Sequence, residues 1–190
     1  MRLDLVVGPN GAGKTTFVRY VVSPAVPGSL FVNADVIAAE RWPEDPERHS
    51  YDAAKIAEET RSRLIDLRRP CIAETVCSHP SKLELVGKAR DAGYYVALHV
   101  VMIPEDLSVA RVAARVVAGG HSVPEDKIRE RHRRLWAIVA EAATSADATT
   151  FWDNSFDDGP CQSALLAGGI LVGNTSWPTW APTELTDRWH

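Results

Sequence analysis

The segment that most constrains the fold of this chain is a glycine-rich octapeptide near its start, Gly8-Pro9-Asn10-Gly11-Ala12-Gly13-Lys14-Thr15. It fits the pattern G-x-x-x-x-G-K-[ST] of the phosphate-binding loop, or P-loop, with an apolar run before it and a helical pattern after it. Glycines at these positions let backbone N–H groups turn inward around an anion at the start of a helix. We therefore predict that the segment from Gly8 to Thr16 binds the phosphates of a nucleoside triphosphate.

Two side chains at the end of the P-loop have predicted chemical roles. The Lys14 ammonium is expected to bridge the β- and γ-phosphates, and the Thr15 hydroxyl is expected to ligate Mg²⁺. The chain has no LSGGQ-like segment, which an ABC-type ATPase needs, and no N-K-x-D segment, which reads guanine in GTPase switches. We therefore expect ATP and Mg²⁺ as cofactors.

Short apolar runs bounded by turn residues alternate with helical patterns along the chain. Most runs are continuously apolar or β-branched, as in strands that are covered on both faces. Strands are expected at 3–7, 29–33, 71–75, 94–103, 149–152 and 164–172. Helices are expected at 14–22, 50–67, 81–92, 106–118 and 124–143. This order predicts an α/β fold, a three-layer α/β/α P-loop NTPase with a mainly parallel sheet.

The length and composition indicate one globular domain. A chain of 190 residues is long enough for one full hydrophobic core and too short for two, so we expect a single P-loop domain over 1–190. The net charge is −4 and the pI is about 5.9, whereas general binders of nucleic acid or acidic membranes usually have the opposite bias. No apolar segment is long enough for a signal peptide or a membrane span. We therefore expect a cytoplasmic protein with no nucleic-acid or membrane partner.

Charge is unevenly distributed in the second half of the chain. Residues 111–134 carry seven basic and three acidic side chains, whereas residues 141–190 carry seven acidic and one basic. Arg111 and Arg115 lie on one helix face, ahead of a pair of glycines and a basic helix. This arrangement predicts a helical lid over roughly 111–134 that closes on phosphates, with a solvated helix face as the alternative. The Trp-rich tail, roughly 174–190, is expected either to pack back on the domain or to contact a second subunit.

Two of the expected strands lead to carboxylates. Asp35 follows the strand at 29–33, and Glu74 lies near the end of the strand at 71–75. Because the carboxyl ends of parallel strands form the ligand-binding edge of an open α/β sheet, both should face the P-loop. Asp35 would accept the proton of an attacking hydroxyl, position Mg²⁺, or cap the helix that follows it. Glu74 would bind substrate hydroxyls or act as an outer-shell acceptor for Mg²⁺.

Several segments together resemble the zeta-toxin family of P-loop kinases. They are GPNGAGKTT (8–16), NAD (33–35), AETV (73–76), AGYYV (92–96), RVAARVVAGGHSVPEDKIRERH (111–132) and DNS (153–155). Toxins of this family use ATP and Mg²⁺ to phosphorylate a sugar hydroxyl of UDP-N-acetylglucosamine. The resemblance implies that Lys14 is the P-loop lysine and that Asp35 activates the sugar hydroxyl. It also implies that Glu74 binds substrate and that Arg115 contacts the transferred phosphate.

The chain departs from that family at one arginine. The second phosphate-contacting arginine falls at His121. Either His121 replaces it as a weaker donor, or Arg129, Arg131 or Arg133 reaches in from the next helix. The departure puts toxicity and the sugar acceptor in doubt and leaves phosphoryl transfer intact. The segment 153–155 is implied to lie near the adenine, with a turn rich in side-chain hydrogen bonds as the alternative.

These patterns lead us to expect an ATP- and Mg²⁺-dependent phosphotransferase that acts on a hydroxyl of a small molecule, with UDP-N-acetylglucosamine as the acceptor that the resemblance suggests. The expected site residues are Lys14, Asp35 and Arg115 for catalysis, Asp35, Glu74, Arg111 and His121 for substrate binding, and Thr15 for the metal. One alternative is another small-molecule kinase, such as an antibiotic or nucleoside phosphotransferase. A second is an ATP-binding regulatory protein without catalysis. An antitoxin partner is left open.

Overall fold

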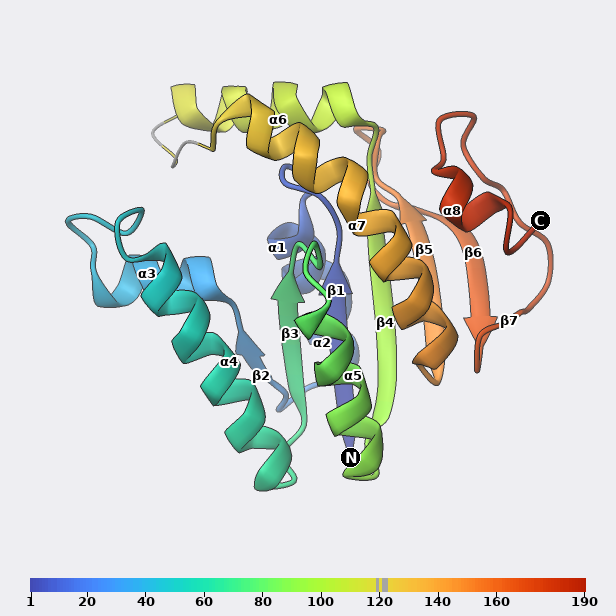
Figure 1. Cartoon of the computed structure of the whole chain (residues 1–190), viewed down its shortest axis with the longest axis horizontal. Coiled ribbons are helices and arrows are strands. Elements are labelled where there is room, and N and C mark those ends of the chain that lie inside the picture. Colours follow the sequence, from blue (N-terminus) through green and yellow to red (C-terminus); the bar gives the residue numbers. More distant parts are fainter. Residues whose placement is uncertain (119, 121–122) are drawn as a thin grey trace.

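A single mixed β-sheet forms the centre of the computed structural model, which describes residues 1–118, 120 and 123–190 (Figure 1). The strands of the described residues are β1 (Arg2–Val7), β2 (Leu30–Val32), β3 (Cys71–Thr75), β4 (Tyr95–Met102), β5 (Ala148–Asp153), β6 (Cys161–Ala167) and β7 (Ile170–Leu171). They are ordered β2-β3-β1-β4-β5-β6-β7. The five strands from β2 to β5 in this order pair in parallel, and β6 and β7 pair antiparallel.

Strand β1 lies inside the parallel part of the sheet, where both of its edges are paired. Val7 at its end is in register with Thr75 of β3 and Val100 of β4. Residues Leu3 to Val7 have no exposed surface, as expected for a strand covered on both faces. The chain that leaves β1 therefore begins the P-loop in a crevice between two neighbouring strands.

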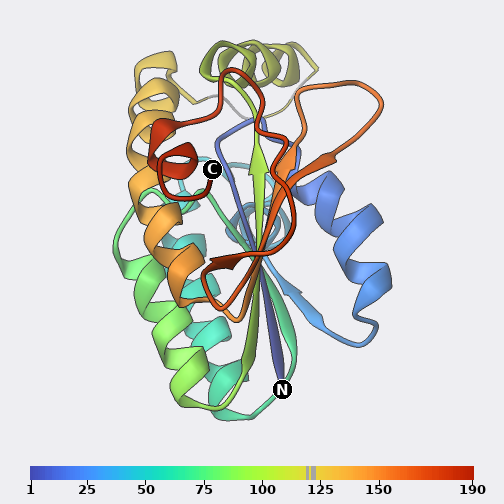
Figure 2. The same ribbon diagram turned by 90° about the vertical axis from the view of Figure 1, so that its right-hand side faces the viewer.

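Helices cover both faces of the sheet. The described ones are α1 (Lys14–Phe17), the π-helical turn η1 (Val18–Val22), α2 (Ser23–Ala25), α3 (Ala34–Arg41), α4 (Ser50–Asp66), α5 (Ser81–Asp91), α6 (Glu105–Val117), α7 (Glu125–Ser145) and α8 (Thr183–Thr186). Seen along the sheet, α4, α5 and α7 lie on one face, and the helical segment from α1 to α2 lies on the other (Figure 2). This arrangement confirms the predicted three-layer α/β/α P-loop fold. In the described part of the chain, no helix combines the length and apolarity that a membrane crossing requires.

Most of the described residues in the segment predicted to be a lid lie in two helices with different surroundings. Helix α6 crosses above the carboxyl edge of the sheet (Figure 1), and its N-terminal part carries Ser108, whose hydroxyl donates to the Asn10 carbonyl of the P-loop. Helix α7 starts beside α6, but from Leu135 onward its inner face is buried in the main core. The second helix is therefore anchored by its C-terminal half, and lid closure stays a prediction.

The continuous strand predicted at 164–172 is wrong. Gly168 and Gly169 have φ angles of 55° and 79° and form a turn, so the chain folds back as the hairpin of β6 and β7. The tail then packs on the sheet. Trp177 packs edge-on against Phe151 at 5.1 Å between ring centroids, and buried Trp189 donates its indole N–H to the Gly169 carbonyl at 3.0 Å.

Candidate active site

The P-loop connects the end of β1 to the first turn of α1. Gly13 caps α1 with a φ of 79°, and Gly11 has a φ of 73°, both in the left-handed region that favours glycine. A Cβ on Gly13 would lie 2.9 Å from Nδ2 of Asn154, which donates to the Ala12 carbonyl at 2.8 Å. Glycine at position 13 therefore allows the left-handed backbone of the turn, and its lack of a side chain leaves room for Asn154 in the segment after β5.

Gly8 lets the P-loop pass close to strand β4. A Cβ there would lie 2.2 Å from the carbonyl oxygen of Val101, a backbone atom that cannot rotate away. We predict that Gly8→Ala lowers the free energy of unfolding by about 2–3 kcal/mol, because the added methyl group would overpack this buried contact. Denaturant-induced unfolding measures the change.

The matched control is Gly87→Ala in α5. A Cβ at Gly87 would meet no heavy atom of another element within 4 Å, so alanine should be neutral or should stabilise the helix by about 0.5–1 kcal/mol. A Gly8→Ala protein as stable as the wild type would contradict the close approach of the P-loop to β4.

Lys14 is buried at the centre of the site. Its Nζ donates to the carbonyl oxygen of Pro9 at 2.9 Å, so the P-loop itself holds the ammonium. Burial lowers the pKa of Lys14, the carboxylates of Glu74 and Asp35 act in the opposite direction, and Arg115 lowers it further. Glu74, Asp35 and Arg115 are therefore close enough for their charges to act on Lys14.

Thr15 and Glu74 join the P-loop to the end of β3. The Thr15 hydroxyl lies 3.1 Å from Oε1 and 3.0 Å from Oε2 of Glu74 and donates to this carboxylate. A hydroxyl and a carboxylate are hard oxygen donors of the kind Mg²⁺ takes together with phosphate oxygens. The two side chains therefore fit a Mg²⁺ ion bound with a nucleotide, and this contact favours the metal-related role of Glu74 over the purely substrate-binding one.

Asp35 projects into the same site from the first turn of α3. The cap of this helix is Asn33, whose Oδ1 accepts from the backbone N–H of Asp35 at 2.6 Å and of Val36 at 3.2 Å. The alternative in which Asp35 caps this helix is therefore wrong. Because Asn33 fills that position, the exposed carboxylate of Asp35 is available to a ligand.

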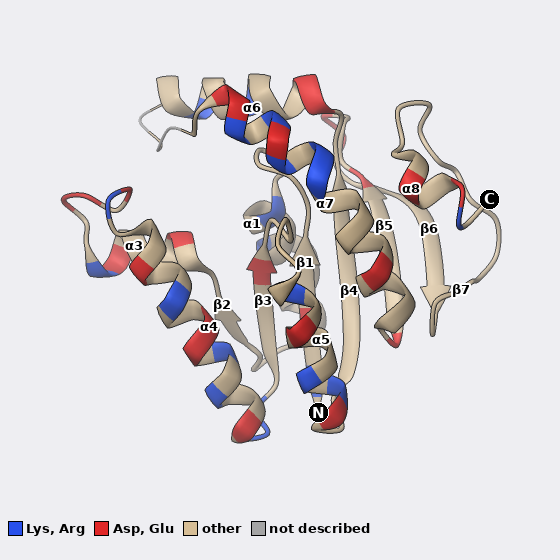
Figure 3. Cartoon of the chain, in the orientation of Figure 1, with Lys and Arg blue, Asp and Glu red and all other residues tan. Residues whose placement is uncertain are grey.

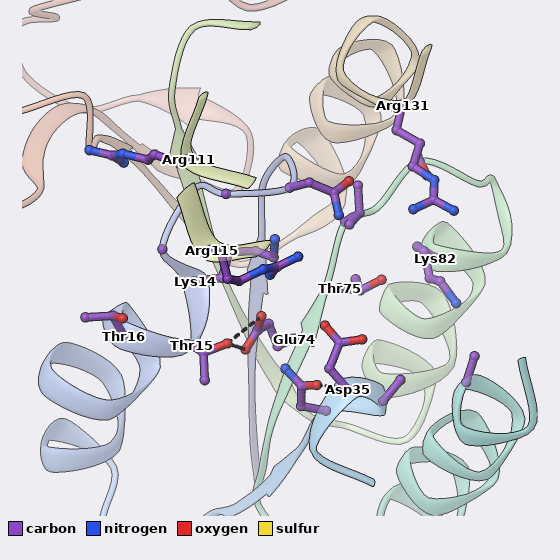
Figure 4. A pocket seen from close by; sticks show the side chains of 18 of the residues that line it. Lys14, Thr15, Thr16, Asp35, Glu74, Thr75, Lys82, Arg111, Arg115 and Arg131 are labelled. Atoms are coloured by element: carbon purple, nitrogen blue, oxygen red, sulfur yellow. Dashed lines mark hydrogen bonds between the residues drawn. The ribbon is translucent and has the colours of Figure 1, made fainter. Parts of the chain in front are cut away.

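A pocket of about 650 Å³ contains these groups (Figure 4). Its described lining residues are Asn10, Gly11, Gly13, Lys14, Thr15, Thr16, Asn33, Ala34, Asp35, Ala54, Arg61, Glu74, Thr75, Val76, Ser78, Lys82, Arg111, Arg115, Arg131 and Arg134. Seven of them are cationic and two are carboxylates. The pocket is therefore suited to an anionic ligand such as a nucleoside triphosphate.

The structure separates the arginines of α7 into two groups. Arg129 binds Glu105 at 2.9 Å and Asp106 at 2.8 Å, and Arg133 lies 3.4 Å from Glu105. Basic and acidic side chains are interleaved along this helix (Figure 3). Arg131 lines the pocket instead, so it is the one of the three predicted substitutes for the second arginine that reaches the site.

Of the other predicted residues, some line the pocket and others do not. Arg115 lines the pocket with Arg111, and Arg111 also donates to the Asn154 carbonyl at 2.9 Å. Ser155 donates its backbone N–H to Oδ1 of Asp153 at 2.9 Å, so this segment contains the side-chain-stabilised turn given as one of its interpretations. His121 lies outside the described residues.

Two pocket residues, Arg61 of α4 and Lys82 of α5, were not predicted from the sequence. For Arg61 a signal existed, since it continues the buried stripe of Ala53 and Ala57 at four-residue intervals. A charge on an otherwise apolar helix face is unusual and points to a specific role. Lys82 carries no comparable signal.

The fold and the P-loop define this protein as a P-loop protein with a kinase-like α/β/α core. A family model described as AAA domain matches residues 3–156. The chain therefore belongs to this AAA domain family of P-loop proteins. It is also 30% identical over 126 residues to an uncharacterized protein of Haemophilus influenzae, a match that covers 66% of this chain and 88% of the relative.

Several solved structures share the fold. The chain matches the AvrRxo1-ORF1:AvrRxo1-ORF2 complex with sulphate ions at a TM-score of 0.70 and 14% identity, over 90% of this chain and 60% of the other. A structure of that complex with ATP matches at 0.65, with the same identity and coverage. The chain thus spans about three-fifths of the length of these matched chains.

Two further matches come from named bacteria. The PezAT chromosomal toxin–antitoxin system of Streptococcus pneumoniae matches at a TM-score of 0.61 and 15% identity, over 84% of this chain and 69% of the other. Shikimate kinase from Acinetobacter baumannii, in complex with shikimate, matches at 0.52 and 19% identity, over 75% and 80%. At these identities the likeness concerns the fold.

Proposed function

We propose that this protein is an ATP- and Mg²⁺-dependent phosphotransferase that phosphorylates a hydroxyl group of a small molecule. The observation that carries the proposal is the position of the Asp35 carboxylate in the same pocket as Lys14, Thr15 and Glu74. Phosphoryl transfer to a hydroxyl needs a base that accepts the hydroxyl proton, and an exposed carboxylate beside the P-loop can fill this role. Kinase-like structural neighbours support the same activity.

The residues around the pocket suggest how the transfer proceeds. Lys14 exchanges its contact with the Pro9 carbonyl for oxygens of the β- and γ-phosphates. Thr15 and Glu74 would hold Mg²⁺, which would supply positive charge against the phosphates.

The acceptor hydroxyl lies at Asp35. Its oxygen bonds to the γ-phosphorus while the bond from that phosphorus to the bridging oxygen breaks. Asp35 takes the hydroxyl proton, and ADP leaves. Arg115 and Arg131 stabilise the charge on the transferred group.

The resemblance to zeta toxins suggests a nucleotide sugar, UDP-N-acetylglucosamine, as the acceptor, with the transfer in the cytoplasm where ATP is available. The toxin–antitoxin system among the structural neighbours adds an antitoxin as a candidate partner. The sequence-based alternatives, an antibiotic or nucleoside phosphotransferase, use the same catalytic groups and differ in the acceptor.

A screen of ADP release tests the proposal. Nucleotide sugars, nucleosides and aminoglycosides are added one at a time with ATP and Mg²⁺, and Lys14→Ala serves as the blank. We expect at least one class to stimulate ADP release above the blank, and mass spectrometry of the product to show an added phosphoryl group. If ADP release stays at the blank level with every acceptor, the protein is an ATP-binding module and the proposal is wrong.

A further inference from the structure

Arg61 is a buried cation that the catalytic groups do not use. Only 5% of its surface is exposed, and it lines the active-site pocket from α4. Within the described residues, no group hydrogen-bonds to its guanidinium or lies within ion-pair distance of it. Burial lowers the pKa of Arg61, and the charge of Glu58 acts in the opposite direction. Because arginine stays protonated in proteins, the Arg61 guanidinium is a buried positive charge that can still bind an anion.

Lys82 adds a second positive charge in the same part of the pocket. Burial lowers the pKa of Lys82 and the nearby charge of Arg61 lowers it further, whereas the carboxylates of Glu58 and Glu84 act in the opposite direction. Both residues line the main pocket and also the small cavity between α4 and α5. Among the described residues no carboxylate lies within ion-pair distance of either cation, so the nearby acids offset their repulsion only in part.

Lys82 lies on the side of the pocket away from the P-loop side chains (Figure 4), and Arg61 lines the same small cavity between α4 and α5. In Figure 4, Asp35 and Thr75 lie between the P-loop side chains and Lys82. The P-loop groups at Lys14 and Thr15 are expected to hold the triphosphate of ATP. Arg61 and Lys82 are therefore left for the molecule whose hydroxyl reaches Asp35.

The chemistry of these groups limits what that molecule carries. A buried guanidinium is best satisfied by a planar or tetrahedral oxyanion, which accepts two parallel hydrogen bonds. A neutral hydroxyl compound leaves both cations without an ion-paired anion, and a polyamine such as an aminoglycoside adds to the repulsion.

We propose, on the basis of the phosphotransferase function above, that Arg61 and Lys82 bind a phosphate or carboxylate group of the acceptor and thereby select anionic hydroxyl compounds over neutral and cationic ones. The acceptor then spans the pocket, with its anionic group between α4 and α5 and its hydroxyl at Asp35. Among the candidate classes, this favours nucleotide sugars and other anionic sugars, and it disfavours nucleosides and aminoglycosides.

Matched acceptor pairs test the selection. ADP release is measured with UDP-N-acetylglucosamine against N-acetylglucosamine, uridine monophosphate against uridine, glucuronate against glucose, and with kanamycin as the cation. The nucleotides represent the phosphate source and glucuronate the carboxylate source. We expect activity with anionic members and not with their neutral partners. Neutral or cationic acceptors that react as well as the anionic ones would overturn the proposal.

Substitution of the two cations tests their role. For the best anionic acceptor, Arg61→Met and Lys82→Met should each raise KM about 10- to 100-fold, the loss expected for a charge-assisted hydrogen bond, with the KM for ATP unchanged. Arg63→Met is the matched control, because Arg63 lies exposed on the same helix and outside the active-site pocket. An unchanged acceptor KM in Arg61→Met and Lys82→Met would contradict the proposal.

Thermal unfolding gives a readout that does not depend on turnover. In the ligand-free protein, Arg61→Met should raise the midpoint by about 2–4 °C, because an uncompensated buried charge is replaced by an apolar side chain of similar length. With ADP present, uridine monophosphate or glucuronate should raise the midpoint of the wild type and not that of Arg61→Met. A lower midpoint in Arg61→Met with no anion-dependent shift in the wild type would show a structural arginine and overturn the proposal.

The two readouts separate this inference from the proposed function. An Arg61-dependent thermal shift without ADP release from any acceptor supports the anion site and contradicts the phosphotransferase. ADP release with neutral acceptors, unaffected by Arg61→Met, supports the phosphotransferase and contradicts the anion site.

Discussion

Replacing Asp35 with asparagine is expected to lower kcat for acceptor phosphorylation by about 100- to 10,000-fold, the usual contribution of a general base. The amide cannot take the proton of the attacking hydroxyl, yet it keeps the size of the side chain. The fold should be unaffected, because the cap of α3 is supplied by Asn33 and not by Asp35. Binding of ATP should also be retained, since Lys14 and Thr15 remain in place.

The measurement is steady-state turnover with the best acceptor, accompanied by calorimetric titration with ATP. Glu40→Gln provides the matched control, because Glu40 is an exposed carboxylate on the same helix and does not line the pocket. It should behave as the wild type. If Asp35→Asn turns over as fast as Glu40→Gln, Asp35 is not the general base.

Lys14→Ala is expected to lower turnover by at least about 100- to 1,000-fold, the effect of losing one preorganised charge at the transferred group. ATP binding should weaken as well. The ammonium is the cation of the P-loop, and without it the carboxylates of Glu74 and Asp35 face the triphosphate with less compensation. Lys14→Ala thus removes the attraction between the ammonium and the phosphates, and it leaves the repulsion between the phosphates and the two carboxylates.

Initial rates and calorimetric titration with ATP measure both effects. Lys127→Ala is the control, since Lys127 pairs with Glu130 at 3.2 Å on the exposed face of α7. It should leave both values unchanged. Retained ATP affinity in Lys14→Ala would mean that the nucleotide phosphates lie elsewhere than in the P-loop.

The parallel core could be predicted from the sequence because its signals are local. Each signal occupies only a few neighbouring residues: the continuous apolar run of β1, the glycines that follow it, and the carboxylates at Asp35 and Glu74 beside their own strands. Once the strands are parallel, their carboxyl ends must meet at one edge, and this brings Asp35 and Glu74 to the P-loop.

Features that depend on distant partners were not predictable in the same way. The basic stretch 111–134 suggests several arginines that could reach the phosphates, but only the acids of α6 decide that Arg129 and Arg133 are paired there. The run 164–172 is a different case, because its glycine pair is a local signal for a hairpin that the apolar residues on both sides obscured, and β7 pairs with β6 across it.

For Arg61, the sequence shows the place on the helix face but not the surroundings of the side chain. Its position on the buried stripe of α4 is visible in the spacing from Ala53 and Ala57, yet the spacing does not say what the charge meets. The structure places it in the pocket with Lys82.

The fate of the γ-phosphate is the most direct test of the central claim. The protein is incubated with ATP, Mg²⁺ and the acceptor that most stimulates ADP release, and phosphorus NMR follows the phosphate released from ATP. A phosphotransferase gives a new phosphate monoester of the acceptor in the same amount as ADP, and Asp35→Asn does not form it. If the phosphate appears as inorganic phosphate, with the acceptor unchanged, the protein is an ATPase and the central claim is contradicted.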